Sequence, residues 1–151
     1  MVGSVRGAGH FRGPARADPG SDNRPMQGLH LTADLRGCAA SRPEMTDTAR
    51  LRRLCLDAVA GAGLTAVGEL FHRFVAAAKP AAEAPTGITG VVLLAESHLA
   101  VHTWPELEAA TVDVYVCNFG ADNSARAEAL MDALVAAFAP CAVERHAQRR
   151  G

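Results

Sequence analysis

The densest group of chemically reactive side chains lies in one apolar stretch, LLAESHLAVHTWPE, residues 93–106. A hydroxyl, two imidazoles and two carboxylates interrupt a run that is otherwise typical of buried strands. Burying an unpartnered polar group costs about 1–3 kcal/mol, and burying an unpaired charge costs more. The stretch is therefore a candidate functional site, and its polar members are Glu96, Ser97, His98, His102 and Glu106.

A further reactive side chain ends the segment TVDVYVC, residues 111–117. In an extended strand, alternation puts His98 and His102 on one face. By the same alternation Cys117 ends the less apolar face of its own strand. If the two strands are neighbours, we expect both imidazoles and the thiol in one cleft, with Ser97 at its end.

The residue types alone leave three interpretations open. Each side chain could be an ordinary polar residue on the solvent-facing side of a sheet, which is common. His98, His102 and Cys117 could ligate zinc, although the HxxxH spacing suits a helix better than a strand. Ser97 or Cys117 could be a nucleophile activated by a histidine, but the sequence lacks the GxSxG motif of a conventional serine hydrolase.

The surrounding pattern predicts the elements that must position these residues. Residues 28–37 alternate apolar and polar side chains, as a half-buried strand does. Thr46 or Asp47 caps a helix that runs to about Ala62. Gly63 supplies its C-terminal stop. The other predicted elements are strands over 64–75, 88–95, 98–104, 111–117 and 141–147, a loop over 76–87, and a helix over 124–138 that Pro140 ends.

This order of elements, β-α-β, β-β, α-β, predicts an α+β fold: a two-layer α/β sandwich with a largely antiparallel sheet. At 151 residues the chain suits one domain with a substantial core. Residues 1–25 are rich in Gly, Pro and Arg without periodicity, so we expect a disordered N-terminal extension there. The folded domain then covers residues 26–151, and Met26 is an alternative start of translation.

Charge and composition argue against several classes of partner. Lys and Arg number 15 against 16 Asp and Glu, which gives no electrostatic case for nucleic acid or an anionic membrane. No apolar run approaches the roughly 20 residues of a membrane-spanning helix, and no secretory signal is evident. Four cysteines lie far apart without a CxxC pair, which predicts reduced thiols and a cytoplasmic location. They are Cys38, Cys55, Cys117 and Cys141.

The motifs GVVLLAESHLAVHTWPE and TVDVYVC resemble the core of the prokaryotic S-adenosylmethionine decarboxylase proenzymes, a pyruvoyl-dependent family. GLHLTADLRGC resembles that family's N-terminal strand, and FHRF, residues 71–74, resembles the motif before its processing loop. The likeness spans about Gly28 to Cys117. It implies decarboxylation of S-adenosylmethionine for spermidine synthesis, and a homodimer of cleaved αβ units whose sheets pair into an αββα sandwich.

The resemblance also implies that the chain cuts itself between Glu96 and Ser97. The serine hydroxyl attacks the preceding carbonyl to form an ester, β-elimination leaves dehydroalanine, and hydrolysis yields a pyruvoyl group and ammonia. The products are a β chain that ends at Glu96 and an α chain that starts at the pyruvoyl group. By motif position His102 is the base for the elimination, and Thr89 assists processing where the family usually has serine.

For the decarboxylation, the resemblance implies a Schiff base between the substrate amine and the pyruvoyl group made from Ser97. Cys117 matches the family's proton donor, Glu106 the residue that binds ribose hydroxyls, and Phe74 an adenine-stacking aromatic. No metal is implied, and the role of His98 stays open. Two alternatives remain: a pyruvoyl-dependent arginine or ornithine decarboxylase of the same fold, and an uncleaved, non-catalytic binding homologue.

The sequence departs from the family pattern in three places. The loop that follows Phe74 is longer than usual and rich in Ala and Pro. Thr89 stands where a serine is usual, and its methyl group restricts χ1, so processing is expected at a different rate. Residues 117–124, CNFGADNS, replace the usual Cys-Gly.

Overall fold

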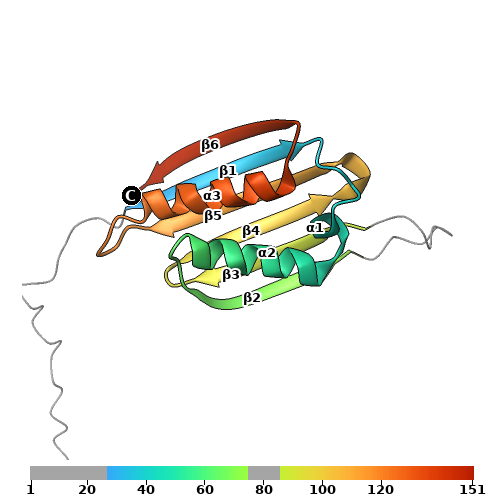
Figure 1. Ribbon diagram of the computed structural model, residues 1–151. Helices are drawn as coiled ribbons and strands as arrows, with labels where there is room; N and C mark the ends of the chain where they lie inside the picture. The colour runs from blue at the N-terminus through green and yellow to red at the C-terminus, as the bar shows by residue number, and fades with distance from the viewer. Residues whose placement is uncertain (1–26, 75–85) are drawn as a thin grey trace, which may run out of the picture.

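The computed structural model describes residues 27–74 and 86–151. In these ranges six strands form one sheet, ordered β2-β3-β4-β5-β1-β6, in which every pairing is antiparallel (Figure 1). The predicted extension over residues 1–25 and positions 76–85 of the predicted loop lie outside the described residues. The elements are β1 (Gly28–Arg36), α1 (Pro43–Thr46), α2 (Thr48–Gly61), β2 (Ala66–Arg73), β3 (Ile88–Leu94), β4 (Ser97–Trp104), the 3₁₀ helix η1 (Pro105–Leu107), β5 (Ala109–Cys117), α3 (Ser124–Phe138) and β6 (Ala142–Arg150).

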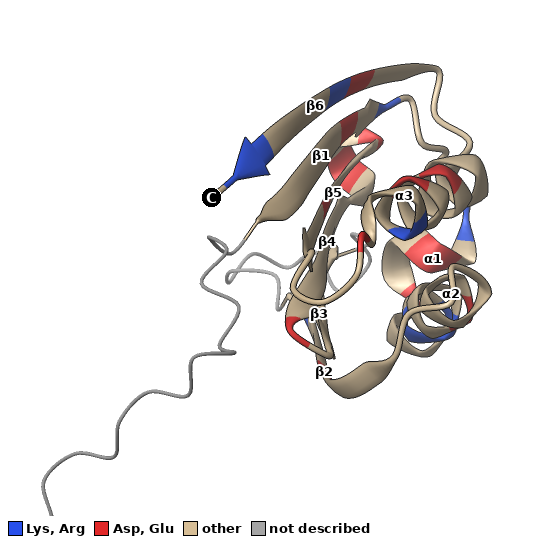
Figure 2. Ribbon diagram, turned by 90° about the vertical axis from the view of Figure 1, so that its left-hand side faces the viewer, with Lys and Arg blue, Asp and Glu red and all other residues tan. Residues whose placement is uncertain are grey.

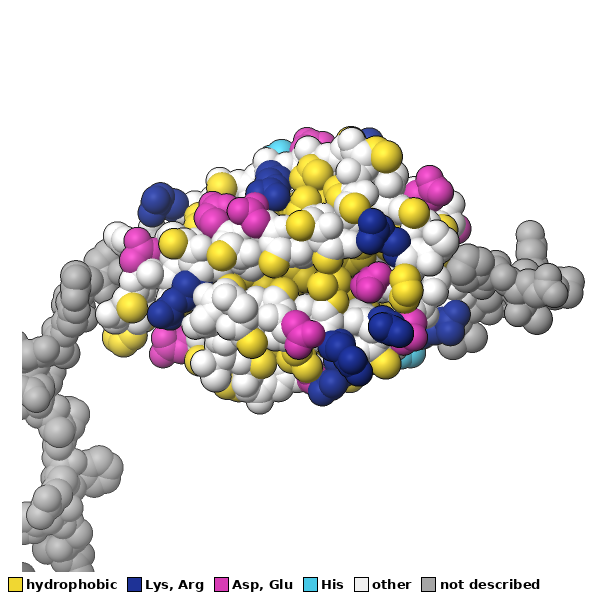
Figure 3. Space-filling view, viewed as in Figure 1, with side chains coloured by type: hydrophobic (Ala, Val, Ile, Leu, Met, Phe, Trp, Pro, Cys, Tyr) yellow, Lys and Arg dark blue, Asp and Glu magenta, His cyan; other side chains and the backbone are white. Residues whose placement is uncertain are grey.

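All helices of the described residues lie on one side of the sheet, and none of them covers the opposite face (Figure 2). Helix α3 packs on β1 and β5, whereas α2 packs on β2 and β3. This confirms the predicted α+β sandwich of two layers. On the helix side, acidic and basic side chains are interspersed over the outer surfaces, and apolar side chains show between the two long helices (Figure 3). Within residues 27–74 and 86–151 no helix is both long and apolar enough to cross a membrane.

Alternating side chains on the central strands build the core. The odd-numbered apolar residues of β1 are buried, and they lie beside the even-numbered apolar residues of β5 in the antiparallel register. The other face of these strands carries polar side chains, so one strand supplies both the core and the open face. The paired core residues are Leu29 with Val116, Leu31 with Val114, Ala33 with Val112, and Leu35 with Ala110.

Helix α2 begins where the sequence predicts. The Asp47 carboxylate accepts hydrogen bonds from the backbone N–H groups of Ala49, at 2.8 Å, and Arg50, at 3.1 Å. These bonds satisfy two unpaired donors of the first turn. The short helix α1 was not predicted. A residue of β4 holds it in place: the buried Thr103 hydroxyl donates a hydrogen bond of 2.8 Å to the Met45 carbonyl and accepts one from the backbone N–H of Ile88 on β3.

Replacing Phe138 with alanine is expected to lower the free energy of unfolding by about 3–5 kcal/mol, because it empties a large buried site beneath α3. Urea denaturation of the purified proteins measures this difference. Phe119→Ala is the matched control, since that side chain is 62% exposed. Its loss should change stability by no more than about 0.5 kcal/mol. Equal effects of the two substitutions would contradict this account of the core.

Candidate functional site

A tight turn at Ala95 and Glu96 joins β3 to β4 and confirms the predicted break in this apolar hairpin. Leu94 pairs with Ser97 across the turn, so only two residues connect the strands. Glu96 has a φ of 62°, in the left-handed region. That region costs a residue with a side chain roughly 1–2 kcal/mol. The residue that precedes the Glu96–Ser97 peptide bond is therefore held in a strained backbone conformation.

The Ser97 side chain contacts the end of the neighbouring strand β5. Its hydroxyl oxygen accepts a hydrogen bond of 3.0 Å from the backbone N–H of Cys117, a residue 20 positions further along the chain. Cys117 is 5% exposed. The hydroxyl and the cysteine, which the sequence predicted to share a site, are thus direct neighbours.

A pocket of about 480 Å³ opens beside this turn. Its aromatic wall is Tyr115, whose ring centroid lies 5.6 Å from that of His98 and 5.5 Å from the Arg150 guanidinium carbon. A Cβ atom at Gly28 would lie 2.7 Å from the Tyr115 ring, so the glycine lets this ring lie against the backbone of β1. The residues that line the pocket are Glu96, Ser97, His98, Tyr115, Arg150 and Gly151.

One carboxylate links the histidines near this pocket. Asp113 lies on the open face of β5, with its two oxygens 2.8 and 2.9 Å from the Nε2 atom of His30. The Nε2 atom of His98 is 3.6 Å from the same carboxylate. The Asp113 carboxylate therefore lies between the imidazoles of His30 and His98.

A second group of predicted site residues lies at the other end of the sheet. The hydroxyl of Thr89 on β3 is 2.8 Å from the Nδ1 atom of His102 on β4, where these two residues are paired. The centroid of the His102 ring also lies 5.9 Å from that of the Trp104 ring. Phe74 follows the last residue of β2, and Glu106 lies in the 3₁₀ helix that follows β4, so both belong to this end.

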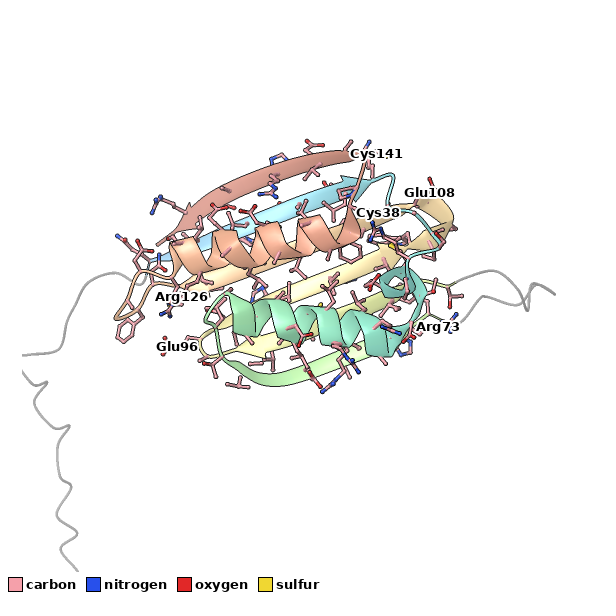
Figure 4. The ribbon with its side chains drawn as sticks, viewed as in Figure 1. Cys38, Arg73, Glu96, Glu108, Arg126 and Cys141 are labelled. Carbon is pink, nitrogen blue, oxygen red and sulfur yellow. The ribbon has the colours of Figure 1, made fainter. Side chains whose placement is uncertain are left out.

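The two groups are separate within one chain. Ser97 and His102 lie five residues apart on β4, which at roughly 3.3 Å per residue puts their Cα atoms about 16 Å apart. Figure 4 shows the same separation: Glu96 lies at one end of the sheet, and Arg73, the neighbour of Phe74, lies at the other. The prediction of one cleft holding Ser97, both imidazoles and the thiol is therefore wrong for a single chain.

We name the two groups by what they contain. The serine group is Glu96, Ser97 and Cys117, and the imidazole group is Phe74, Thr89, His102 and Glu106. The alternative zinc site requires His98, His102 and Cys117 as its ligands. Because His102 lies at the opposite end of the sheet from Cys117, these three side chains do not meet within one chain. Over residues 27–74 and 86–151, no cluster of three or more His, Cys, Asp or Glu side chains is arranged to hold a metal ion.

The four cysteines are all free thiols in the structure. Burial raises the pKa of the Cys55 thiol to about 12, and burial also raises the pKa of Cys38. Both lie in the core, away from the serine group. Their chemistry is that of inert core thiols. Cys117 is thus the only cysteine that contacts Ser97 among the hydrogen bonds of the described residues.

Sequence reasoning missed several residues around the serine group. Tyr115 and Asp113 lie on the polar face of TVDVYVC, and the alternation of that segment could have identified them. Their partners could not be found in this way, because His30 and Arg150 come from strands at opposite ends of the chain. Only the order β5-β1-β6 brings those strands together.

Comparison with known proteins identifies relatives over most of the chain. The protein-family model described as S-adenosylmethionine decarboxylase matches residues 29–151. The S-adenosylmethionine decarboxylase proenzyme of Aquifex aeolicus is 37% identical over 124 residues, which are 82% of this chain and 81% of that protein. The proenzyme of Symbiobacterium thermophilum is 37% identical over 107 residues, 71% of this chain and 73% of that protein.

A solved structure matches as well. The crystal structure of the adenosylmethionine decarboxylase from Aquifex aeolicus superposes with a TM-score of 0.69 at 35% sequence identity. The match covers 83% of this chain and 92% of that one. Sequence and fold therefore point to the same relatives.

Proposed function

Because the chain belongs to the S-adenosylmethionine decarboxylase family, we infer that it is a decarboxylase that releases the carboxyl group of S-adenosylmethionine as CO2. We propose further that it is made as a proenzyme that cuts itself between Glu96 and Ser97. The observation that carries this proposal is the strained turn at Glu96, with the Ser97 hydroxyl held against the backbone of Cys117.

The turn supports self-cleavage in two ways. The left-handed conformation of Glu96 raises the energy of the intact chain, so breaking the bond relieves strain. The hydrogen bond from the Cys117 N–H limits the orientations of the Ser97 hydroxyl. This restraint favours orientations in which the hydroxyl attacks the adjacent carbonyl carbon over orientations in which it points into solvent. Cleavage then converts Ser97 into the pyruvoyl group that we propose as the covalent cofactor.

The residues of the serine group suit such a cofactor. A pyruvoyl group supplies a carbonyl that binds the substrate amine and withdraws electrons from the bond to the carboxyl group. The Cys117 thiol, buried beside residue 97, then provides the proton that replaces the carboxyl group on the substrate carbon. The product is decarboxylated S-adenosylmethionine, which we propose serves as the aminopropyl donor for spermidine.

We propose that a homodimer completes the site. His102 lies about 16 Å from Ser97 of its own chain, too far for a proton transfer between them. The sheet face that carries His102 has no helix of the described residues on it, and its apolar side chains Leu70 and Leu93 are 69% and 51% exposed. A two-fold pairing of two such faces gives an αββα sandwich and brings the serine group of one protomer to the imidazole group of the other.

In this arrangement the imidazole group has three tasks. His102 is the base that removes the proton from the Cα atom of residue 97 during processing, and its bond to Thr89 fixes the ring orientation. Glu106 binds the ribose hydroxyls of the substrate, for which two carboxylate oxygens are suited. Phe74, whose side chain is partly exposed, stacks on the adenine.

The alternative substrates arginine and ornithine have no support among the relatives reported above, whose names all specify S-adenosylmethionine or adenosylmethionine. We propose a cytoplasmic location for the enzyme, since its four free thiols suit a reducing compartment.

The deciding experiment incubates the cleaved protein with carboxyl-labelled S-adenosylmethionine, arginine or ornithine and measures the labelled CO2. We expect release from S-adenosylmethionine and at least about a hundredfold less from the two amino acids, which lack groups for Glu106 and Phe74. Cys117→Ser is the matched variant, expected to cleave but to turn over at least about tenfold more slowly because a hydroxyl is a weaker acid. No release from any of the three substrates would refute the assignment.

A further inference from the structure

In the loop between β5 and α3, Asn123 makes hydrogen bonds to both Asn118 and Cys117. The side-chain amide of Asn123 donates a hydrogen bond of 3.0 Å to the Cys117 carbonyl. The backbone N–H of Asn123 donates to the Asn118 side-chain oxygen at 2.9 Å. Both bonds are partly buried. This is the segment where CNFGADNS departs from the Cys-Gly of the family.

Asn123 occupies the N-cap position of α3 without capping the helix. A side-chain oxygen at this position usually accepts from an N–H of the first helical turn. Here no such bond is made, and Asp122 accepts from the Ser124 N–H instead, at 2.9 Å. The hydrogen bonds from Ser124 lower the pKa of Asp122. The Asn123 oxygen accepts from Arg126, so its amide group remains for Cys117.

The bond from Asn123 completes a set of restraints on both sides of Cys117. The Cys117 N–H donates to Ser97, and its carbonyl accepts from Asn123. The next N–H along the chain, of Asn118, donates to the Gln27 carbonyl at 2.7 Å. In the uncut chain these bonds restrain the peptide groups on both sides of Cys117. The proposed cleavage removes the Ser97 hydroxyl, so in the cleaved enzyme the bonds made by Asn123 and Asn118 remain, and they hold the peptide group that follows Cys117 and restrain its ψ angle.

We propose that Asn123 is a positioning residue that aims the Cys117 thiol at the substrate carbon. This inference rests on the proposed function, in which that thiol supplies the proton. Proton transfer depends strongly on the direction and distance of the donor, and a misplacement of about 1 Å can cost roughly a hundredfold in rate. In this chain the asparagine pair thus fixes, by side-chain hydrogen bonds, the backbone that follows the proton donor.

Asn123→Asp tests the proposal with a minimal change. Aspartate keeps the size and the acceptor oxygen that Arg126 contacts, and it is a good N-cap residue, but it cannot donate to the Cys117 carbonyl. In the cleaved enzyme we expect kcat to fall by about fivefold or more with KM little changed. Asp122→Ala is the matched control: it removes a hydrogen bond at the same helix end without touching Cys117, and its kcat should stay within about twofold of the parent.

A second measurement does not need the active enzyme. In a Ser97→Ala, Cys141→Ser background, we expect Asn123→Asp to raise the rate of Cys117 alkylation by iodoacetamide at least about threefold, read from the Cys117 peptide by mass spectrometry. Asn123→Ala serves in its place if the aspartate variant does not fold. Unchanged alkylation and unchanged kcat would overturn the inference, as would an equal effect of Asp122→Ala. Since alkylation is measured in uncleaved protein, it stays informative if the proposed activity itself fails.

Discussion

Replacing Ser97 with alanine is expected to leave the 151-residue chain in one piece and to reduce decarboxylation by roughly 10³-fold or more. The methyl group cannot attack the Glu96 carbonyl, so no ester forms and no cofactor is made. The strained turn at Glu96 remains, because the substitution removes only the hydroxyl and its bond with Cys117. Intact-mass spectrometry and denaturing electrophoresis distinguish one full-length chain from the two pieces of the parent.

Ser41→Ala is the matched control, since that serine is exposed and lies far along the chain from the turn. It should be cut and active like the parent. Cleavage between positions 96 and 97 in the Ser97→Ala protein would show that the hydroxyl is not the nucleophile. A parent protein that stays uncut after long incubation would instead support the non-catalytic homologue.

Two inactive variants are expected to restore each other when their protomers mix. His102→Ala lacks the proposed base, and Ser97→Ala lacks the residue proposed to become the cofactor, so each alone should fall below about 1% of parental activity. In a mixed dimer with paired faces, one composite site keeps both residues. Random mixing makes about half of the dimers mixed with one intact site each, so about a quarter of parental activity should return.

Coexpression followed by the labelled-CO2 assay measures this restoration, and mass spectrometry identifies which chain is cut. Only the His102→Ala chain should be cleaved, because it carries the intact serine. His146→Ala, which changes an exposed histidine of β6, is the control and should be active alone. If mixing restores nothing, His102 does not act across a dimer. If His102→Ala alone is cleaved at the parental rate, another group is the base.

The strands and long helices followed from the sequence because local rules determine them. Alternation in GLHLTADLRG predicted the strand now found at Gly28–Arg36, and the carboxylate of Asp47 predicted the start of α2. Helix α1 could not be found in this way, because four residues form too few hydrogen bonds to be stable alone. It depends on burial of Met45 and on the hydroxyl of Thr103, 58 residues away.

The arrangement of the site was harder to predict, because adjacency in sequence and in space differ along an extended chain. Ser97 and His102 are five positions apart in the sequence, yet in an extended strand their Cα atoms are separated by about 16 Å. Conversely, Ser97 and Cys117 are 20 positions apart and hydrogen-bonded. The prediction of the site residues used only their types and motifs, whereas their division into two groups required the register of β3, β4 and β5.

If the chain is cut between Glu96 and Ser97 as proposed, the strand order has a consequence for the cleaved molecule. A break between positions 96 and 97 leaves β1, β2 and β3 on one polypeptide and β4, β5 and β6 on the other. In the order β2-β3-β4-β5-β1-β6, three of the five strand pairings then join different polypeptides, with β1 inserted between two strands of its companion. The pieces cannot separate without dismantling the sheet. Unfolding of the cleaved molecule is thus also a dissociation of its two polypeptides. Its unfolding equilibrium therefore depends on protein concentration, whereas the unfolding of an uncut chain into one unfolded polypeptide does not.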